Sequence, residues 1–125
     1  MTLVERYLQR VSHAVESIRN ASVEYYTEQL LAETRANLRF KLCWSEDAFL
    51  EVSEAIESRD NALLWLSYRY HFQDAGFILR YDDAPHHSGL NTYPQHRHQG
   101  AGVGEGRRPD LETFLQEVRA YSHLW

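Results

Sequence analysis

Three runs of the chain alternate apolar and polar side chains, and no other feature of the sequence restricts the fold as strongly. The runs span residues 38–42, 64–72 and 77–82, and their apolar members are Leu38, Phe40, Leu42, Leu64, Leu66, Tyr68, Tyr70, Phe72, Phe77, Leu79 and Tyr81. Successive side chains of a β-strand point to opposite faces, so a period of two predicts strands with one buried face. Gln73-Asp74-Ala75-Gly76 separates the last two runs and predicts a tight hairpin.

Two earlier stretches, residues 23–33 and 49–56, are further candidates for strands. The second also fits a helix, because Phe49, Val52 and Ile56 repeat at helical spacing. Strands joined by short connections pair with their neighbours along the chain. We therefore expect an antiparallel meander of about five strands within residues 20–83.

Helical periodicity marks both ends of the chain. Residues 2–18 place apolar side chains three and four positions apart, and Thr2 with Glu5 has the form of a capping box. Residues 110–121 repeat the helical spacing, with Asp110 in the position of an N-cap.

These elements fit a single α+β domain over residues 1–125, in which two helices flank one antiparallel sheet. A chain of this length buries roughly two-thirds of its unfolded surface on folding. Its 43% hydrophobic content is enough to form a core that does not need stabilising cross-links. Cys43 is the only cysteine, which excludes an internal disulfide and a cysteine zinc cage. No apolar run approaches the ~20 residues of a membrane helix. Charged residues interrupt the N-terminal stretch where a signal peptide is apolar, so we expect a cytoplasmic protein.

Residues 83–109 show neither period, and we expect a loop there. They hold all three prolines, five of the six glycines, and Tyr93, His86, His87, His96 and His98. An irregular stretch of this length inside a domain is usually functional or disordered, and aromatic residues and histidines are unusual in pure disorder. The glycines of residues 100–106 match neither the dinucleotide nor the P-loop pattern, so we interpret them as a hinge. We therefore look for the functional site in this loop.

The charge distribution restricts the kind of site. The chain has 13 basic and 18 acidic residues, a net charge of −5, yet basic residues slightly exceed acidic ones over residues 80–108. An acidic chain with one local basic, His-rich segment argues against a broad nucleic-acid surface. It permits a compact site for a phosphate or a metal. All basic residues except Lys41 are arginine, whose guanidinium suits phosphate.

Three chemistries fit these residues. His96-x-His98 on an extended segment directs both imidazoles to one side, so they could bind a metal with Asp82, His86 or His87. Two histidines could instead cleave a phosphodiester without a metal, one as base and one as acid. Arg97 or Arg80 would then stabilise the phosphoryl oxygens. In the third interpretation the histidines hold a turn through hydrogen bonds to the backbone.

Three segments carry a resemblance to a known family. They read YRYHFQD at residues 68–74, LRYDDAPHH at 79–87 and YPQHRH at 93–98. Their Y-D-x-A-P-H-H and H-x-H motifs resemble those of TumE-type toxins, small proteins of bacterial and archaeal toxin–antitoxin modules. The resemblance covers about residues 60–120. It implies a toxin encoded beside a helix-turn-helix antitoxin, held inactive by binding it, with RNA cleavage as its activity.

The resemblance assigns the motif to Asp82, His86, His87, His96 and His98, with Arg80 and Arg97 as its basic members. Asp83 departs from the pattern, which leads us to expect Asn. An additional carboxylate beside histidines raises their pKa or favours a metal.

We accordingly predict a ribonuclease toxin without a cofactor or a metal. Catalysis is assigned to His96 and His98 as the acid–base pair, assisted by Asp82, His86 and His87; Arg80, Arg97 and Tyr93 bind the substrate. The expected partners are the antitoxin, RNA and a second copy of the chain that could pair at a sheet edge. We expect no membrane association. One alternative is a non-enzymatic protein whose His-rich loop docks a partner or a structural metal. The other is a metal-dependent hydrolase.

Overall fold

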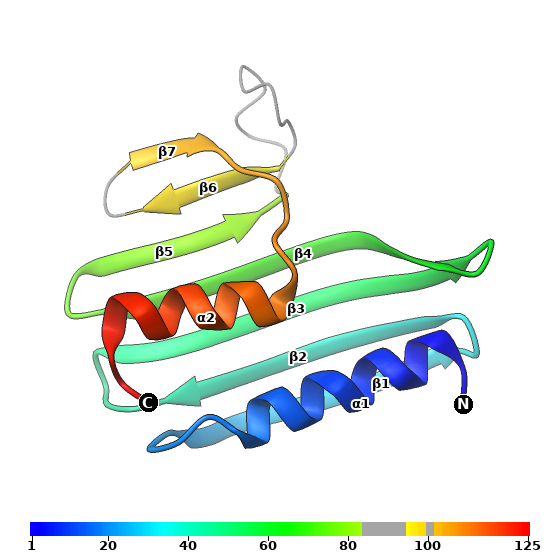
Figure 1. The fold of residues 1–125 in the computed structure, drawn as a ribbon, viewed down its shortest axis with the longest axis horizontal. Coiled ribbons are helices and arrows are strands. Elements are labelled where there is room, and N and C mark those ends of the chain that lie inside the picture. The colour runs from blue at the N-terminus through cyan, green and yellow to red at the C-terminus, as the bar shows by residue number, and fades with distance from the viewer. Residues whose placement is uncertain (84–94, 100–101) are drawn as a thin grey trace.

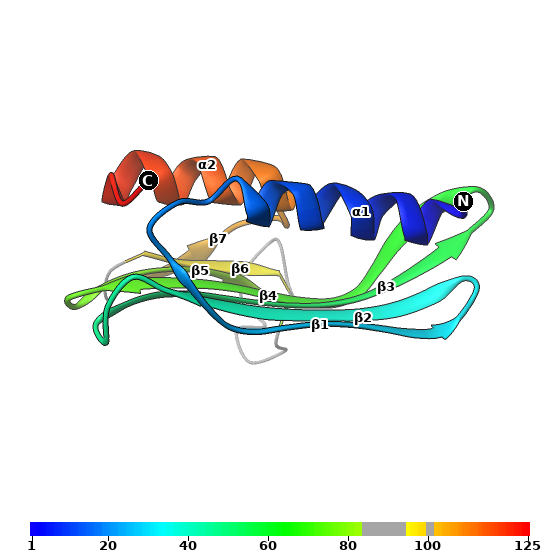
Figure 2. The same ribbon diagram turned by 90° about the horizontal axis from the view of Figure 1, so that it is seen from below.

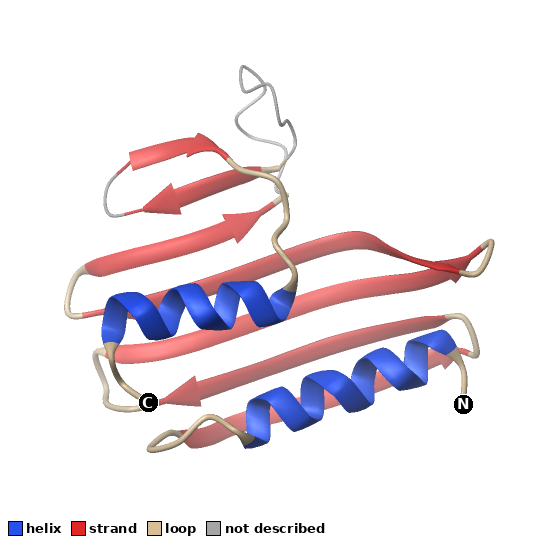
Figure 3. Ribbon diagram, in the orientation of Figure 1, coloured by secondary structure: helices blue, strands red, loops and turns tan. Residues whose placement is uncertain are grey.

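Both helices pack on one face of an antiparallel sheet (Figures 1 and 2). The structure is a computed structural model, and it describes residues 1–83, 95–99 and 102–125. The elements are α1 (Leu3–Glu16), β1 (Ser22–Ala32), β2 (Arg35–Cys43), β3 (Ala48–Arg59), β4 (Ala62–Asp74), β5 (Phe77–Asp82), β6 (His96–Gln99), β7 (Gly102–Glu105) and α2 (Leu111–Ser122). Strand order in the sheet follows chain order, and all neighbours pair antiparallel. The predicted α+β class, with a helix at each end of a meander, is confirmed (Figure 3).

Within residues 20–83 the structure has five strands, β1 to β5, as the short connections led us to expect; with two further strands, the described residues form a sheet of seven. The two additional strands, β6 and β7, lie within residues 83–109, where we expected only a loop. β6 reads His-Arg-His-Gln and β7 reads Gly-Val-Gly-Glu, so neither has the apolar alternation that marks a strand in a sequence. Their extended conformation depends on pairing with β5 and with each other. His86, His87 and Tyr93 lie outside the described residues.

The alternating runs identify most of the buried face correctly. The helical alternative for residues 49–56 is wrong, because they belong to β3 and pair with strands on both sides. In β4 the predicted alternation fails at Leu64 and Leu66, which are exposed, while Trp65 packs against the core. A register shift between β3 and β4 inserts one extra residue at this point, so the side chains before it point to the opposite face.

Local signals at the ends of elements behave largely as the sequence predicts. Thr2 and Glu5 form the complete capping box of α1. Asp110 occupies the N-cap of α2, but its side chain makes no capping hydrogen bond. Ala75 and Gly76 turn the β4–β5 hairpin with φ angles of 46° and 94°, the left-handed conformation of the two-residue turns that match strand twist.

The core lies between the sheet and the two helices, which cover the same face (Figure 2). Helix α1 contributes Val4, Tyr7, Leu8, Val11 and Val15, and α2 contributes Leu111, Phe114, Leu115 and Val118. Neither helix of the described chain has the length and apolarity needed to cross a membrane.

A carboxylate is buried within this core. Glu54 of β3 is 2% exposed, and it accepts hydrogen bonds from the Tyr7 hydroxyl at 2.5 Å, from the Tyr70 hydroxyl and from Trp65 Nε1 at 2.8 Å. Burial, and next the charge of Glu54, raises the pKa of both phenols, so they remain protonated donors. A buried charge is costly unless its oxygens are bonded, and these three donors come from α1 and β4.

Arg108, shortly before α2, extends this network. Its Nη1 donates to the Tyr70 hydroxyl at 3.1 Å, and its guanidinium carbon lies 3.5 Å from the centre of the Trp65 ring. Its backbone N–H donates to Gln95 Oε1 at 2.6 Å. Because Gln95 directly precedes β6, the network connects the core to the start of that strand.

We expect Glu54→Ala to lower the free energy of unfolding by about 3 kcal/mol or more, because two buried phenols and a partly buried indole lose their acceptor at once. Urea denaturation followed by circular dichroism measures this change. Glu57→Ala is the matched control on the same strand: Glu57 is partly exposed and pairs with exposed Arg59, so its loss is worth less than about 1 kcal/mol. Equal losses in the two variants would contradict a special role for Glu54.

Candidate functional site

The register between β5 and β6 brings the polar side chains of the two strands together. Asp82 is paired with His96, and Arg80 with His98. Tyr81 lies between Asp82 and Arg80 and points the other way, onto α2. Residues paired across an antiparallel ladder share a face, so Asp82, His96 and His98 lie together on the sheet face opposite the helices.

The three side chains form one compact cluster. His96 Nε2 lies 2.6 Å from Asp82 Oδ1, and His98 Nε2 lies 3.7 Å from Asp82 Oδ2. The centres of the two imidazole rings are 4.9 Å apart, and their planes are inclined by 64°. Each residue presents a ligand atom, and these atoms all lie within 4.8 Å of one another.

The cluster is buried, although each of its members can carry a charge. Asp82 is 5% exposed, His96 is 0% and His98 is 9%. Buried ionisable groups are normally paired or bound to a metal, because an isolated charge away from water is strongly unfavourable. A carboxylate beside two imidazoles can pass protons near neutral pH or coordinate a cation.

The structure separates the two arginines that the sequence analysis assigns to the substrate. Arg80 lies on the face of the cluster, with its Nε 3.5 Å from Asp82 Oδ2. Arg97 stands between the two histidines in sequence and therefore points to the helix face. There its Nε donates to the Tyr81 hydroxyl at 2.7 Å, and its Nη2 donates to Glu117 Oε2 at 3.2 Å. Only Arg80 is beside the cluster.

The sequence analysis gives His71 of β4 no role in the site, but the structure places it on the face of the cluster. The β4–β5 register pairs it with Arg80, and its Nε2 lies 3.0 Å from Gln73 Oε1. Burial, and next the charges of Arg69 and Arg80, lowers the pKa of His71, while its bond to Gln73 acts in the opposite direction. Alternation along β4 indicates its face, but its closeness to Arg80 follows only from the register.

Three of the predicted site residues, His86, His87 and Tyr93, lie outside the described residues, so their roles stay predictions. The described residues bring together Asp82, His96 and His98, with Arg80 beside them, and leave Arg97 on the other face.

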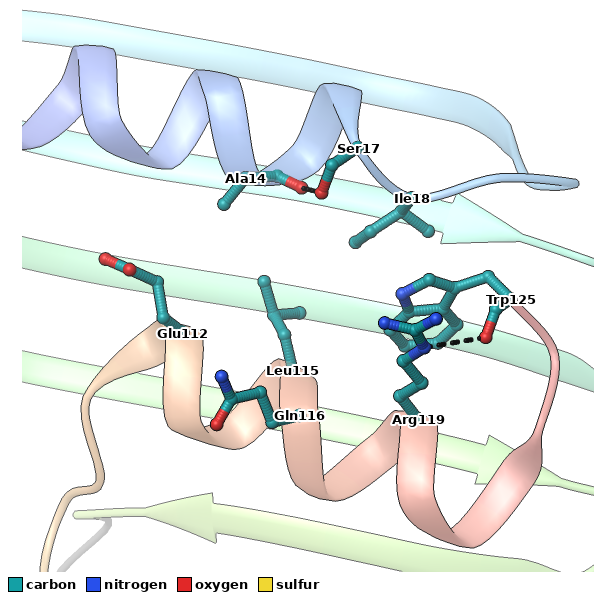
Figure 4. A pocket seen from close by; sticks show the side chains of 8 residues that line it. All are labelled: Ala14, Ser17, Ile18, Glu112, Leu115, Gln116, Arg119 and Trp125. Atoms are coloured by element: carbon teal, nitrogen blue, oxygen red, sulfur yellow. Dashed lines mark hydrogen bonds between the residues drawn. The ribbon is translucent and has the colours of Figure 1, made fainter.

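A pocket of about 240 Å³ lies elsewhere, between the C-terminal end of α1 and the side of α2 (Figure 4). Ile18, Leu115 and Trp125 line it, and Arg119 Nε donates to the carbonyl oxygen of Trp125 at 2.9 Å. Its lining contains no member of the His cluster, which lies across the sheet. The pocket therefore has no part in the chemistry of the cluster.

The family model described as Toxin TumE matches residues 5–122. No curated protein and no solved structure matches the chain.

We expect Asp83→Asn to raise the free energy of unfolding at pH 7. Burial, and in addition the charge of Asp82, raises the pKa of Asp83, although the carboxylate accepts a hydrogen bond from the Tyr68 N–H at 3.3 Å. A raised pKa in the folded state means that the ionised carboxylate destabilises the fold, and stability is lost as pH rises from the unfolded pKa of about 3.9. Asn keeps the acceptor without the charge.

Denaturation of the two proteins at pH 7 and at pH 3.5 measures the effect. The advantage of Asp83→Asn shrinks at the lower pH, where Asp83 is mostly protonated in both states. An advantage that is independent of pH would contradict the electrostatic cause.

Proposed function

The chain belongs to the TumE family of toxins, and on this premise we propose that it cleaves RNA, with Asp82, His96 and His98 as the reactive centre. One observation supports the proposal most directly: a carboxylate and two imidazoles from neighbouring strands converge beside an arginine. Cleavage of a phosphodiester needs groups that exchange protons near neutral pH and a positive charge near the phosphate. Imidazole and guanidinium meet these two needs.

In a reaction without a metal, the exposure of the side chains supports different roles for the two histidines. The side chain of His98 is 11% exposed and that of His96 is 1% exposed. A general acid or base must reach the proton that it transfers, so we assign proton exchange with the ribose 2′-hydroxyl or the leaving oxygen to His98. His96, in contact with Asp82, holds that carboxylate in place as a positioning residue.

Arg80 is the described residue best placed to bind phosphate. Its side chain is 29% exposed, so it is accessible from solvent while it remains next to Asp82. His86, His87 and Tyr93 stay predicted contributors from the motif segments.

A toxin of a toxin–antitoxin module has an antitoxin as its partner, and we propose a helix-turn-helix protein for this role. The RNA substrate implies action in the cytoplasm. Strand β1 forms one edge of the sheet and exposes Val23, Leu30 and Leu31. Exposed edges pair with other chains, so this edge is where we propose that the antitoxin or a second copy pairs.

We expect His98→Ala and Asp82→Asn each to reduce the rate of RNA cleavage by about 10²- to 10⁴-fold, the usual range for loss of proton transfer. The assay measures cleavage of purified cellular RNA by the isolated protein, with circular dichroism to verify folding. His71→Gln is the matched control, because His71 is also buried on this face but lies outside the cluster. If folded wild-type protein cleaves no cellular RNA, the proposed activity is wrong.

Arg80→Gln and Arg97→Gln separate phosphate binding from stability. We expect Arg80→Gln to lower kcat/KM for RNA by at least about 10-fold, in keeping with a charged hydrogen bond. Arg97→Gln removes contacts to Tyr81 and Glu117 on the helix face, so it should lower Tm and leave kcat/KM within about 2-fold. Steady-state kinetics and thermal denaturation of both variants test this, and the reverse pattern would show that the substrate binds on the helix face.

A further inference from the structure

We propose that Asp82, His96 and His98 form a binding site for one divalent transition-metal ion. Among the residues that the structure describes, these three form the group of His, Cys, Asp or Glu side chains whose ligand atoms gather within reach of an ion. The inference rests on the proposed function for the reaction that the ion serves. The binding itself can be measured without it.

The spacing of the ligand atoms is close to what an ion requires. Ligands at about 2.1 Å from an ion are about 3.0 Å apart in octahedral geometry and about 3.4 Å apart in tetrahedral geometry. In the cluster, His96 Nε2 lies 2.6 Å from Asp82 Oδ1, His98 Nε2 lies 3.7 Å from Asp82 Oδ2, and one ligand atom from each residue lies within 4.8 Å of the others. Side-chain rotations that move these atoms by roughly 1 Å would bring them to the separations of ligands around one ion.

The backbone places all three side chains on one face of the sheet. His96 and His98 are two residues apart on β6, so both point to the same face, and Asp82 is held opposite His96 by the β5–β6 ladder. Sites on regular elements hold their ligands more accurately than sites on loops.

The donor set indicates the class of metal. Two imidazole nitrogens and one carboxylate oxygen suit Zn²⁺, Mn²⁺, Fe²⁺ or Co²⁺, whereas Mg²⁺ and Ca²⁺ prefer oxygen ligands alone. Three protein ligands leave at least one position of the ion open to water or substrate, as catalytic sites do and closed structural sites do not.

The electrostatic surroundings fit a cation that acts on a phosphate. The buried Asp82 carboxylate lies beside Arg80 and the two histidines, and a divalent ion among these side chains would add positive charge next to it. Arg80 Nε, 3.5 Å from Asp82 Oδ2, contacts the same carboxylate from outside the cluster. This guanidinium repels a cation, which lowers metal affinity, but it is well placed to bind a phosphate that bridges to the ion.

A bound ion changes the roles of the histidines. Coordination uses the Nε2 lone pair, so His96 and His98 hold the ion and do not exchange protons with RNA. The ion would lower the pKa of a bound water; its hydroxide would form a new P–O bond as the P–O bond to the leaving ribose oxygen breaks, and that oxygen would take a proton from solvent. The two mechanisms therefore differ in whether a chelator stops the reaction.

The test titrates the chelator-treated full-length protein with Zn²⁺ by calorimetry and with Co²⁺ by visible absorption. We expect one ion per chain and, with Co²⁺, the d–d bands of a site that contains nitrogen ligands. His98→Gln and Asp82→Asn should each weaken binding by at least about 100-fold, because each removes or weakens a direct ligand, and the loss of an outer-shell group alone costs roughly 10- to 100-fold. His71 is another buried histidine on this face, so the variant His71→Gln should bind the ion as the wild-type protein does.

Two variants and a folding check by circular dichroism keep the test decisive if one variant unfolds. Absence of binding by folded wild-type protein, or equal binding by wild type and a folded cluster variant, overturns the proposal. RNA cleavage with and without EDTA separates it from the proposed function. Cleavage that survives EDTA, in a protein that binds no ion, refutes the metal site alone. One ion per chain without any RNA cleavage refutes the ribonuclease alone.

Discussion

The buried carboxylate of Glu54 is the interaction on which the arrangement of the other elements depends. It receives donors from α1 and from two positions of β4, so the helix and the sheet cannot separate without leaving a charge or its donors unpaired in the core. The Tyr70 hydroxyl also accepts a hydrogen bond from the Arg108 side chain, and the Arg108 backbone N–H donates to Gln95, the residue before His96. A core interaction in the first half of the chain therefore helps to position the strand that carries both histidines.

Alternation along β6 places the histidine cluster on one face of the sheet and the packing against α2 on the other. His96 and His98 face Asp82, while Arg97 between them binds Tyr81 and Glu117 beneath α2. The H-R-H motif thus serves both faces of the sheet within three residues. Gly106 adds a constraint from the neighbouring segment, because a Cβ there would lie 2.5 Å from Arg97 Cβ. The glycines after β6 are thus not simply a hinge, since one of them permits close packing against this arginine.

Strands with an apolar face could be predicted from the sequence, and strands held only by their neighbours could not. The runs in β2 and β5 alternate because one face of each strand packs against the helices. This packing is visible in the sequence as a regular order of apolar and polar residues. β6 and β7 are polar or glycine-rich and leave none. For the same reason the sequence indicated the chemistry of His96, His98 and Asp82 but not the register that joins them. Glu54 did leave a signal, a charged residue at an inward position between Val52 and Ile56, yet its three donors are distant in sequence.

The family match covers most of the chain, and the candidate site depends on most of the fold. The motif segments lie within residues 68–98, but the match extends over residues 5–122. A cluster on two short strands has little stability of its own, because isolated hairpins are marginal in water. β5 is held by β4, β4 by β3 and Glu54, and these by α1 and α2. The chemistry of three side chains on β5 and β6 therefore depends on nearly the whole chain, including an N-terminal half that carries no motif.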